Sequence, residues 1–468
     1  MVVGDTITAI ATAPGRGGVA VVRVSGPDAF AIAEKLAGVE KGEAYPSSDA
    51  SCEASAMRGA SSPLVRIRKI RFPSSGGDAA SPLIDEGVVL AFRSPHSYTG
   101  EDVVEFQCHG GAVTPRRVLE ACLAAGARLA RRGEFTERAF LNGKLDYDQA
   151  ESVLDLVDAK TARAADAALE GLAGRKRREL KALYDAALDI STRLEHALDV
   201  DEGELADDYV CNLRSQISDL RFQIAEAIRR ANEGKILREG ALVVLAGPPN
   251  AGKSSLLNAL LEENRAIVSD VPGTTRDSIE AWLDLDGWPI RLVDTAGLRE
   301  AKDEVEGEGV RRSEDLIAKA DVVVLLQVPG FRFQGSGFDS IDLKRETCNL
   351  KLIPIHPKCD LGRGPGLNVS AKTGEGLDEL KKAIVARLEA KVDTADEGDV
   401  ATGDAVALHE ALALLDKGRG TEDERREEDL VLQANAVRGA AERLGAAVGA
   451  TYSSDLLANL FSRFCVGK

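Results

Sequence analysis

The most specific pattern in this chain is Gly247-Pro-Pro-Asn-Ala-Gly-Lys-Ser254, which fits G-x-x-x-x-G-K-[ST]. It follows the apolar run Ala241-Leu-Val-Val-Leu-Ala246, typical of a buried strand, and leads into Ser255-Leu-Leu-Asn-Ala-Leu-Leu261, typical of a helix. In this context the glycines let backbone N–H groups point at phosphates, and the helix start favours negative charge. We expect Lys253 to reach the β- and γ-phosphates and the Ser254 hydroxyl to ligate Mg²⁺.

Two further motifs follow within about fifty residues, namely Gly273-Thr-Thr-Arg-Asp277 and Asp294-Thr-Ala-Gly297. Thr275 offers a second hydroxyl to Mg²⁺. Asp294 ends an apolar strand, where its carboxylate would hold the metal's water shell, and Gly297 would give its N–H to the γ-phosphate. The first motif alone leaves open a plain strand-to-helix turn, but the three together predict that the chain binds a nucleoside triphosphate.

Length and composition indicate an ordinary multidomain globular protein. The 468 residues allow two to four domains, and 44% are hydrophobic and 29% charged. No run approaches the roughly 20 apolar residues of a membrane span. Met1–Ile10 resembles neither a signal peptide nor a transit peptide. Seven scattered cysteines predict no disulfide framework and no zinc site, so we expect a reducing, intracellular compartment.

The net charge of −17 argues against a broad surface that coats nucleic acid, because phosphate neutralisation drives most such binding. Two local basic clusters remain, Arg66-Ile-Arg-Lys-Ile-Arg71 and Arg175-Lys-Arg-Arg178. We interpret both as solvated faces or an exposed strand edge. The residues alone therefore indicate an RNA partner only weakly.

Hydrophobic patterning divides the chain into four predicted domains. Residues 1–143 mix short helices with strands predicted at 19–24, 86–92 and 103–107. Residues 41–82, rich in Ser, Ala and Gly, are predicted to be an irregular insertion. Residues 144–240 predict the first part of a helical domain, and residues 391–468 the second part.

Between the helical parts, residues 241–390 alternate strands with helices. The strands are predicted at 241–246, 281–285, 289–294, 321–328, 350–356 and 366–370. This alternation indicates a three-layer α/β domain with a mostly parallel sheet. The predicted fold class is therefore multidomain α/β: an N-terminal α+β domain and an all-α helical bundle interrupted by an inserted P-loop domain.

The chain resembles the MnmE (TrmE) family of tRNA-modification GTPases over nearly its full length. Besides the phosphate-binding motifs, four stretches carry the resemblance: Ala13-Pro-Gly-Arg-Gly-Gly-Val-Ala-Val-Val-Arg-Val-Ser-Gly-Pro27, Ser97-Tyr-Thr-Gly-Glu-Asp-Val-Val-Glu-Phe-Gln-Cys-His-Gly-Gly111, Arg132-Gly-Glu-Phe-Thr-Glu-Arg-Ala-Phe-Leu-Asn-Gly-Lys-Leu-Asp146 and the last four residues, Cys465-Val-Gly-Lys468. Several GTPase families share the phosphate motifs, whereas these stretches are specific to this one.

The resemblance implies that the N-terminal domain dimerises and binds a tetrahydrofolate derivative in its 5-formyl or methylene form. The implied folate contacts are Arg23, Glu105, Lys144 and Lys468. Arg and Lys suit the glutamyl carboxylates, and a carboxylate suits the donors of a pterin. Without the family, each would be an ordinary surface ion-pair residue.

Two other residues of these stretches carry reactive side chains. We interpret His109 as a structural histidine. Cys465 by itself reads as a buried cysteine, and only the resemblance makes it a participant in the tRNA modification.

The resemblance also specifies the GTPase switch. Leu298 stands where many small GTPases carry a water-orienting Gln, and the family instead assigns that catalytic role to the position of Glu306. A K⁺ ion is implied at Asn250, Ser269, Val271 and Thr274, and Mg²⁺ at Ser254 and Thr275. The implied GTP contacts are Asn250, Ala251, Gly252, Lys253, Ser254, Ser255, Ser269, Thr274, Thr275, Asp294, Gly297, Lys358, Asp360, Ser370, Ala371 and Lys372.

The guanine-reading loop departs from its usual pattern. Where such sites carry Asn-Lys-x-Asp, this chain has Pro357-Lys-Cys-Asp360. Asp360 can still accept two charge-assisted hydrogen bonds, whereas the missing amide removes about 0.5–1.5 kcal/mol. We expect a weakened guanine preference, while Ser370-Ala-Lys372 supports GTP.

The resulting expectation is a GTP-hydrolysing enzyme of tRNA modification. By resemblance it forms a homodimer and a heterotetramer with an FAD-dependent subunit of the MnmG (GidA) family. Together they would install a carboxymethylaminomethyl or aminomethyl group at carbon 5 of wobble uridine. A cytoplasmic location is expected, with the mitochondrial matrix or chloroplast stroma as alternatives. The rival functions are a ribosome-assembly GTPase, a folate-dependent aminomethyltransferase and a degenerate paralogue with weakened turnover.

Overall fold

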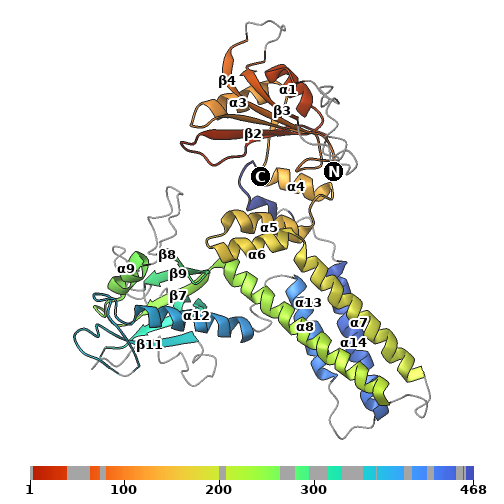
Figure 1. The fold of residues 1–468 in the computed structure, drawn as a ribbon, viewed down its shortest axis with the longest axis vertical. Coiled ribbons are helices and arrows are strands. Elements are labelled where there is room, and N and C mark those ends of the chain that lie inside the picture. The colour runs from red at the N-terminus through yellow and green to blue at the C-terminus, as the bar shows by residue number, and fades with distance from the viewer. Residues whose placement is uncertain are drawn as a thin grey trace, which may run out of the picture. The chain divides into compact units, whose positions relative to one another are not determined.

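The chain separates into two compact units in the computed structural model (Figure 1). Met1–Leu154 and Thr451–Lys468 form the first, and Asp155–Ala450 form the second. The structure describes residues 4–39, 64–73, 81–199, 207–263, 280–294, 315–328, 351–364, 366–394, 403–418, 426–449, 457 and 460–467. No helix within these ranges is both long and apolar enough to cross a membrane.

The first unit is built on a six-stranded sheet in the order β3-β4-β5-β2-β1-β6. Its strands are β1 Ile7–Ile10, β2 Val19–Ser25, β3 Leu64–Arg71, β4 Leu83–Phe92, β5 Val103–His109 and β6 Arg128–Leu129. Neighbours pair antiparallel, except that β6 runs parallel to β1.

Helices cover both faces of this sheet. The helices α1 (Ala29–Ala37) and α3 (Thr114–Ala124) contribute Phe30 and Val118 to the core on one face. On the other face Phe135 of α4 (Glu134–Leu141) packs with Ile7 and Ala9 of β1. This assignment follows from β-strand alternation, since Ile7 and Ala9 point away from the face that Ile10 joins.

The strands predicted at 19–24, 86–92 and 103–107 are confirmed as β2, β4 and β5. The irregular insertion predicted for 41–82 was partly wrong, because its residues 64–71 form strand β3 at the edge of the sheet. Ile70 lies in the core while Ile67 is exposed, which is the period-two pattern of a half-covered strand. The basic side chains of this stretch suit an edge, since charge there opposes pairing with another chain.

The last described residues of the chain belong to the first unit. Phe461 and Phe464 pack with Ala150 and Leu154 of α5 (Tyr147–Asp158). The backbone of Val466 forms a bridge with Arg132, whose Nε donates to the Phe464 carbonyl at 2.9 Å. The sequence pattern had grouped these residues with the helical domain, because a short aromatic segment does not reveal which surface it packs against.

Helices from two separate parts of the chain share one core in the second unit. They are α7 Arg175–Asp199, α8 Asp207–Glu239, α13 Gly403–Lys417 and α14 Arg426–Val448, whereas α6 Ala162–Leu172 contributes Ala164 to the core of the α/β segment. Leu194 and Leu220, which precede the α/β segment, are fully buried together with Leu444, which follows it. The α/β segment is therefore inserted into a single helical bundle.

The inserted segment contains a six-stranded sheet in the order β12-β11-β10-β7-β9-β8. Its strands are β7 Ala241–Ala246, β8 Glu280–Leu285, β9 Trp288–Asp294, β10 Val322–Leu326, β11 Leu352–Pro357 and β12 Leu367–Val369. All are parallel except β8, and all six predicted strands are confirmed within two residues at each end.

Helical residues cover both faces of this second sheet. The helices α9 (Lys253–Glu263) and α12 (Leu377–Thr394) pack on one face, and Leu316 and Ile317 on the other. The helix α12 runs past residue 390, the predicted domain boundary.

Candidate functional site

The loop between β7 and α9 has the geometry of a phosphate-binding loop. The strand β7 is buried along its whole length, so the loop emerges at the carboxyl end of a strand inside the sheet. Asn250 and Gly252 have φ angles of 60° and 98°. Lys253 is 5% exposed, and its Nζ donates to the carbonyls of Gly247 and Pro248 at 3.0 and 2.9 Å. The ammonium group therefore lies across the loop, where phosphate oxygens would take the place of these acceptors.

The first and third motifs meet at the end of strand β9. The Ser254 hydroxyl donates to Oδ2 of Asp294 at 2.6 Å, and Asp294 is 1% exposed. The parallel pairing of β7 with β9 brings them together, since Asp294 stands opposite Leu245 in the register. A hydroxyl and a carboxylate are hard oxygen ligands of the kind Mg²⁺ prefers, so these two residues fit the predicted metal.

A cavity of about 270 Å³ lies beside this loop. Asp360, Ser370 and Lys372 line it, together with Pro357 at the end of β11. Ser370 is fully buried, and its hydroxyl donates to Oδ1 of Asp360 at 2.7 Å, which orients the carboxylate. The cavity brings together Asp360 and Ser370-Ala-Lys372, the residues predicted to contact guanine, with Pro357 where such sites usually carry Asn.

Lys358 connects the cavity to the phosphate-binding loop. Its φ is 57°, and its Nζ donates to the carbonyl of Asn250 at 3.0 Å. Pro357, the last residue of β11, pairs with Val369 and lines the cavity. Its ring offers no hydrogen-bond donor to a ligand there. Burial raises the pKa of Cys359, the residue after Lys358, so its thiol stays protonated.

Most of the predicted nucleotide contacts converge on this cavity and loop. The residues that the structure places there are Asn250, Ala251, Gly252, Lys253, Ser254, Ser255, Asp294, Lys358, Asp360, Ser370, Ala371 and Lys372. The other predicted site residues of this domain, Ser269, Val271, Thr274, Thr275, Gly297 and Glu306, lie outside the described residues, as does Lys468.

In the first unit, Arg23 and Glu105 form an ion pair on the sheet face that α4 covers. They face each other across β2 and β5, with Nε and Oε1 2.7 Å apart and side chains 19% and 16% exposed. The Arg23 guanidinium lies 5.2 Å from the ring centroid of Tyr98 and 5.5 Å from that of Phe135. The Tyr98 hydroxyl lies 2.9 Å from Oγ1 of Thr136, and burial raises the pKa of Tyr98.

The structure joins two of the four predicted folate residues. Lys144 is exposed, and its Nζ donates to the carbonyl of Pro95 at 3.1 Å. Among the described contacts, none links Lys144 to Arg23 or Glu105. A ligand bound beside the ion pair would have to draw the flexible Lys144 side chain toward it.

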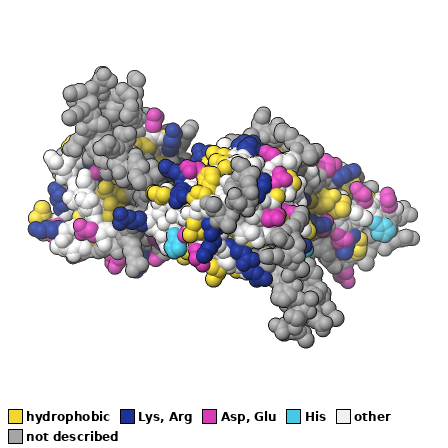
Figure 2. Space-filling view, turned by 90° about the horizontal axis from the view of Figure 1, so that it is seen from above, with side chains coloured by type: hydrophobic (Ala, Val, Ile, Leu, Met, Phe, Trp, Pro, Cys, Tyr) yellow, Lys and Arg dark blue, Asp and Glu magenta, His cyan; other side chains and the backbone are white. Residues whose placement is uncertain are grey.

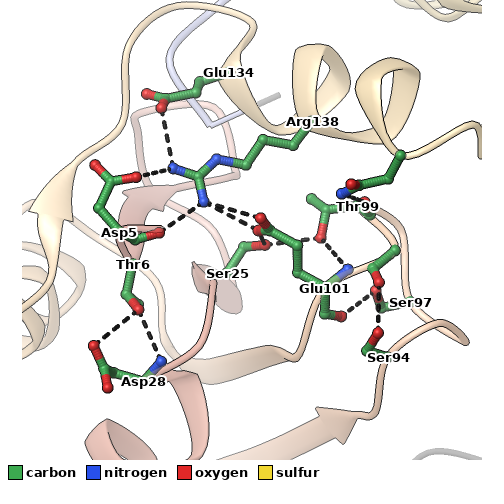
Figure 3. Close-up of polar contacts among 12 residues, drawn as sticks. Asp5, Thr6, Ser25, Asp28, Ser94, Ser97, Thr99, Glu101, Glu134 and Arg138 are labelled. Atoms are coloured by element: carbon green, nitrogen blue, oxygen red, sulfur yellow. Dashed lines mark hydrogen bonds and ion pairs between the residues drawn. The ribbon is translucent and has the colours of Figure 1, made fainter. Parts of the chain in front are cut away.

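A network of charged side chains centred on the buried Arg138 positions the residues around the Arg23–Glu105 pair (Figure 3). The sequence did not predict this network. Arg138 of α4 is 1% exposed, and its guanidinium donates to Asp5 at 2.7 Å, to Glu101 at 3.1 Å and to Glu134 at 3.2 Å. Ser25 also donates to Glu101, at 2.7 Å. The network ties the start of β1, the end of β2 and the turn before β5 to one helix.

Glu134 is held ionised by this network. Burial opposes its charge, but hydrogen bonds from Arg128 at 2.7 and 3.1 Å, from the Arg131 N–H at 2.7 Å and from Arg138 at 3.2 Å together outweigh burial and lower the pKa of Glu134 to about 2. The network holds both α4, which carries Phe135, and the turn before β5, which carries Tyr98. It therefore positions the two aromatic rings that contact the Arg23 guanidinium. The only sequence signal was the i,i+4 spacing of Glu134 and Arg138.

Cys465 is exposed, which corrects the expectation of a buried cysteine. By contrast, burial raises the pKa of Cys108 to about 11 and that of Cys122 to about 12. His109 is also exposed, at 74%, and its Nδ1 lies 2.9 Å from Oδ1 of Asp85. Cys465 is therefore accessible to reagents in a way that the buried thiols are not.

Comparisons with known proteins cover the whole chain. The family model described as "GTP-binding protein TrmE N-terminus" matches residues 6–144, and "MnmE helical domain" matches residues 148–465. The protein named "tRNA modification GTPase MnmE" from Symbiobacterium thermophilum is 40% identical over 480 residues and covers 99% of each chain. The protein of the same name from Nitrosomonas europaea is 37% identical over 485 residues and covers 100% of each.

A third relative and one solved structure complete the comparison. The MnmE of Xanthomonas campestris pv. campestris is 40% identical over 472 residues, which is 99% of each chain. The crystal structure of the G domain of the T. maritima FeoB iron transporter is 28% identical and covers 31% of this chain and 98% of its own, with a TM-score of 0.23. That score is too low to support a structural argument.

Proposed function

The chain belongs to the MnmE family of tRNA modification GTPases, and on this premise we propose that it couples GTP hydrolysis to modification of carbon 5 of the wobble uridine. The observation that carries the proposal is the bond from Ser254 to Asp294 beside the cavity of Asp360 and Ser370. One domain thus contains the Ser254 hydroxyl, which would bind the metal, the buried Asp294 carboxylate, and the Asp360 carboxylate, which would contact the base.

The nucleotide contacts divide between phosphates and base. When nucleotide binds, the Lys253 ammonium group would donate to phosphate oxygens in place of the Gly247 and Pro248 carbonyls, and the Ser254 hydroxyl would be a ligand of Mg²⁺. Mg²⁺ in such a site neutralises charge on the β- and γ-phosphates. The Asp360 carboxylate, oriented by Ser370, accepts hydrogen bonds from the donors of guanine.

The catalytic group for hydrolysis is proposed from the family pattern. Glu306 would orient the water that attacks the γ-phosphate, since Leu298 cannot. K⁺ would bind at Asn250 with Ser269, Val271 and Thr274 and add positive charge beside the phosphates, as an arginine finger does elsewhere.

The first unit is proposed to bind the one-carbon donor, a 5-formyl or methylene tetrahydrofolate. Glu105 offers a carboxylate to the donors of a pterin ring, and Tyr98 and Phe135 provide flat apolar surfaces beside it. Arg23, Lys144 and Lys468 are the proposed partners of the anionic part of the folate. The exposed Cys465 is proposed to take part in the modification itself.

Partners and location extend the family pattern to this chain. We propose a homodimer, a heterotetramer with an FAD-dependent MnmG-type subunit, and tRNA as the substrate. The relatives named above are bacterial, which supports a cytoplasmic location. Family membership favours this function over the ribosome-assembly alternative.

Reconstitution tests the proposal. The chain, the FAD-dependent subunit with NADH, unmodified tRNA, GTP, folate and an amine source (glycine or ammonium) would be combined, and the nucleosides analysed by mass spectrometry. We expect a modified wobble uridine that disappears when GTP, folate or either protein is omitted. A product that forms equally well without this chain would contradict the proposal.

A further inference from the structure

A second cavity, of about 590 Å³, lies in the first unit at one end of its sheet. Residues 12–17 between β1 and β2 form part of its wall, and the turn 110–112 with the start of α3 forms another. Val466 of the C-terminal segment closes a third side. Nothing in the proposed GTP or folate chemistry uses this cavity.

The cavity is separate from the Arg23–Glu105 pair. Ala20 of β2 lines the cavity and belongs to the core under α1 and α3, whereas Arg23 packs against Phe135 of α4. Side chains at positions 20 and 23 of one strand point to opposite faces of the sheet. Ala9 and Val19, which lie on the same face as Arg23, also line the cavity, so it extends around the end of the sheet, but neither Arg23 nor Glu105 is among its lining residues.

The walls combine apolar side chains with two guanidinium groups. Ile10, Leu119 and Val466 supply apolar surface, and Arg16 and Arg116 carry the charge. Among the described residues, neither arginine has an ion pair or a side-chain hydrogen bond. Both side chains are exposed, so each can turn toward an anion at the cavity mouth.

The backbone closes tightly around one side of the cavity. A Cβ on Gly110 would lie 2.1 Å from the carbonyl oxygen of Gly17, so the two loops touch main chain to main chain. A substituent at Gly110 would push them apart. This side of the wall is therefore built of backbone, whereas the two arginine side chains are exposed.

An apolar slot with paired cations at its rim suits a flat ring that carries phosphate. Its volume falls within the range typical of small-ligand pockets. Enzymes that modify a base take it out of the stack and hold it in such a pocket. The exposed Cys465 is the immediate neighbour of the wall residue Val466.

We propose that this cavity receives the wobble nucleotide of the tRNA, with the base against Ile10 and Leu119 and its flanking phosphates on Arg16 and Arg116. The inference rests on the proposed function, because it takes tRNA to be the substrate.

The charge distribution favours such a localised contact. With a net charge of −17, the chain as a whole repels RNA. Among the residues coloured in Figure 2, Lys and Arg side chains form separate groups with acidic and hydrophobic side chains between them. A few unpaired arginines at a cavity can therefore account for much of the RNA affinity.

Fluorescence anisotropy with a labelled, unmodified anticodon stem-loop tests the charge contacts. The full-length chain would be compared with the double variant R16Q/R116Q and with R117Q, a matched control on the same helix that does not line the cavity. We expect the double variant to bind at least about 10-fold more weakly, with a salt slope smaller by about 2, and R117Q to bind like the wild type. Equal affinities for the double variant and R117Q, or no saturable binding by the wild type, would overturn the proposal.

An RNA that lacks the wobble base tests the slot. The wild type should lose affinity for this abasic stem-loop by about 10-fold, the effect of one stacked base. The variant L129W, which fills the cavity, should bind both RNAs equally. Undiminished binding of the abasic RNA by the wild type would contradict the base contact.

Two further readouts separate the possible failures. Hydrogen exchange of β1 and β5 peptides reports whether the first unit of each variant is folded, and binding of 5-formyltetrahydrofolate reports on the folate site. If R16Q/R116Q loses folate binding while it keeps RNA binding, the cavity holds the folate and our inference is wrong. If the wild type binds RNA through the cavity but the reconstituted complex modifies no uridine, the proposed function is wrong and the cavity contact stands.

Discussion

Ser254 and Asp294 are joined by a hydrogen bond of 2.6 Å, although 40 positions separate them in the chain. Asp294 is 1% exposed, so water does not solvate its charge. The parallel pairing of β7 with β9 places both residues at the carboxyl edge of the sheet, where ligands of such folds bind. Two residues of the proposed metal site are thus already in contact without a bound nucleotide.

Ser254→Ala should abolish most of the GTPase activity. The change removes a Mg²⁺ ligand and leaves the buried Asp294 carboxylate without this donor. We expect single-turnover GTP hydrolysis to fall by about 100-fold or more. Thr192→Ala, which removes an exposed hydroxyl of α7, should leave the rate unchanged. Similar rates for both variants would show that Ser254 does not bind the metal.

Hydrolysis should be faster in KCl than in NaCl at equal ionic strength, because the proposed cation site beside Asn250 selects K⁺. We expect a difference of at least about 10-fold in single-turnover rate. Asn250→Gly should remove the difference, since glycine keeps the φ of 60° but lacks the amide. Equal rates in the two salts would contradict the proposed K⁺ site and favour the alternative of a degenerate paralogue with weakened GTP turnover.

Pro357→Asn should strengthen the preference for guanine. The amide would restore a hydrogen bond to the base at the wall of the cavity, worth about 0.5–1.5 kcal/mol, or roughly a 2- to 10-fold lower Kd. The Kd values of GTP and ATP would be measured in parallel. Pro354→Asn on the same strand is the control, because Pro354 does not line the cavity. No change in the ratio would mean that the loop geometry forbids the contact.

Arg138→Met should lower the stability of the first unit. The change removes the buried cation that Asp5, Glu101 and Glu134 share, while Arg128 still pairs with Asp5 and Glu134, so we expect a loss of about 3 kcal/mol in the free energy of unfolding. Arg131→Met, which removes a 66% exposed arginine from its pair with Glu137 and from a longer pair with Glu134, should cost under about 1 kcal/mol. Hydrogen exchange of β1 and β5 peptides in urea would report on this unit, because both tryptophans lie in the other one. Comparable losses for the two variants would contradict the assigned role.

The stability of the first unit should depend on pH through Glu134. Its pKa in the folded state is about 2, below the ordinary value of 4.5, so the folded state favours the ionised form. This contribution, on the order of 3 kcal/mol, is complete above pH 4.5 and is lost as the pH falls toward 2. Glu134→Gln should therefore be less stable than the wild type at pH 6, and the gap should close near pH 2. A gap that stays constant with pH would refute this account.

Much of the nucleotide-binding domain could be predicted from short stretches of the chain. The run 241–246 has the apolar character of a buried strand, and the loop that follows makes its contacts through its own backbone. The contacts of Lys253 with Gly247 and Pro248 are equally local. Such features depend on neighbours within a few residues, so the order of the residues is enough to specify them.

The support of the folate site could not be predicted in this way. Arg138 meets Asp5 across 133 positions and Glu101 across 37, and no periodicity in any one segment encodes those meetings. The strand β3 was predicted only as one alternative, an exposed strand edge, within a stretch otherwise predicted to be irregular, because its pairing with β4 depends on residues farther along the chain.

The sequence alone thus determines the phosphate-binding loop, the alternation of strands and helices, and the family. Each of these depends on short motifs and on the spacing of nearby residues. The folded chain alone decides that Cys465 is exposed, that Arg138 is buried among carboxylates, and that Arg16, Arg116 and Val466 surround one cavity. The physical reason is that burial and ionic partnership depend on what packs nearby in space, and those neighbours come from distant parts of the chain.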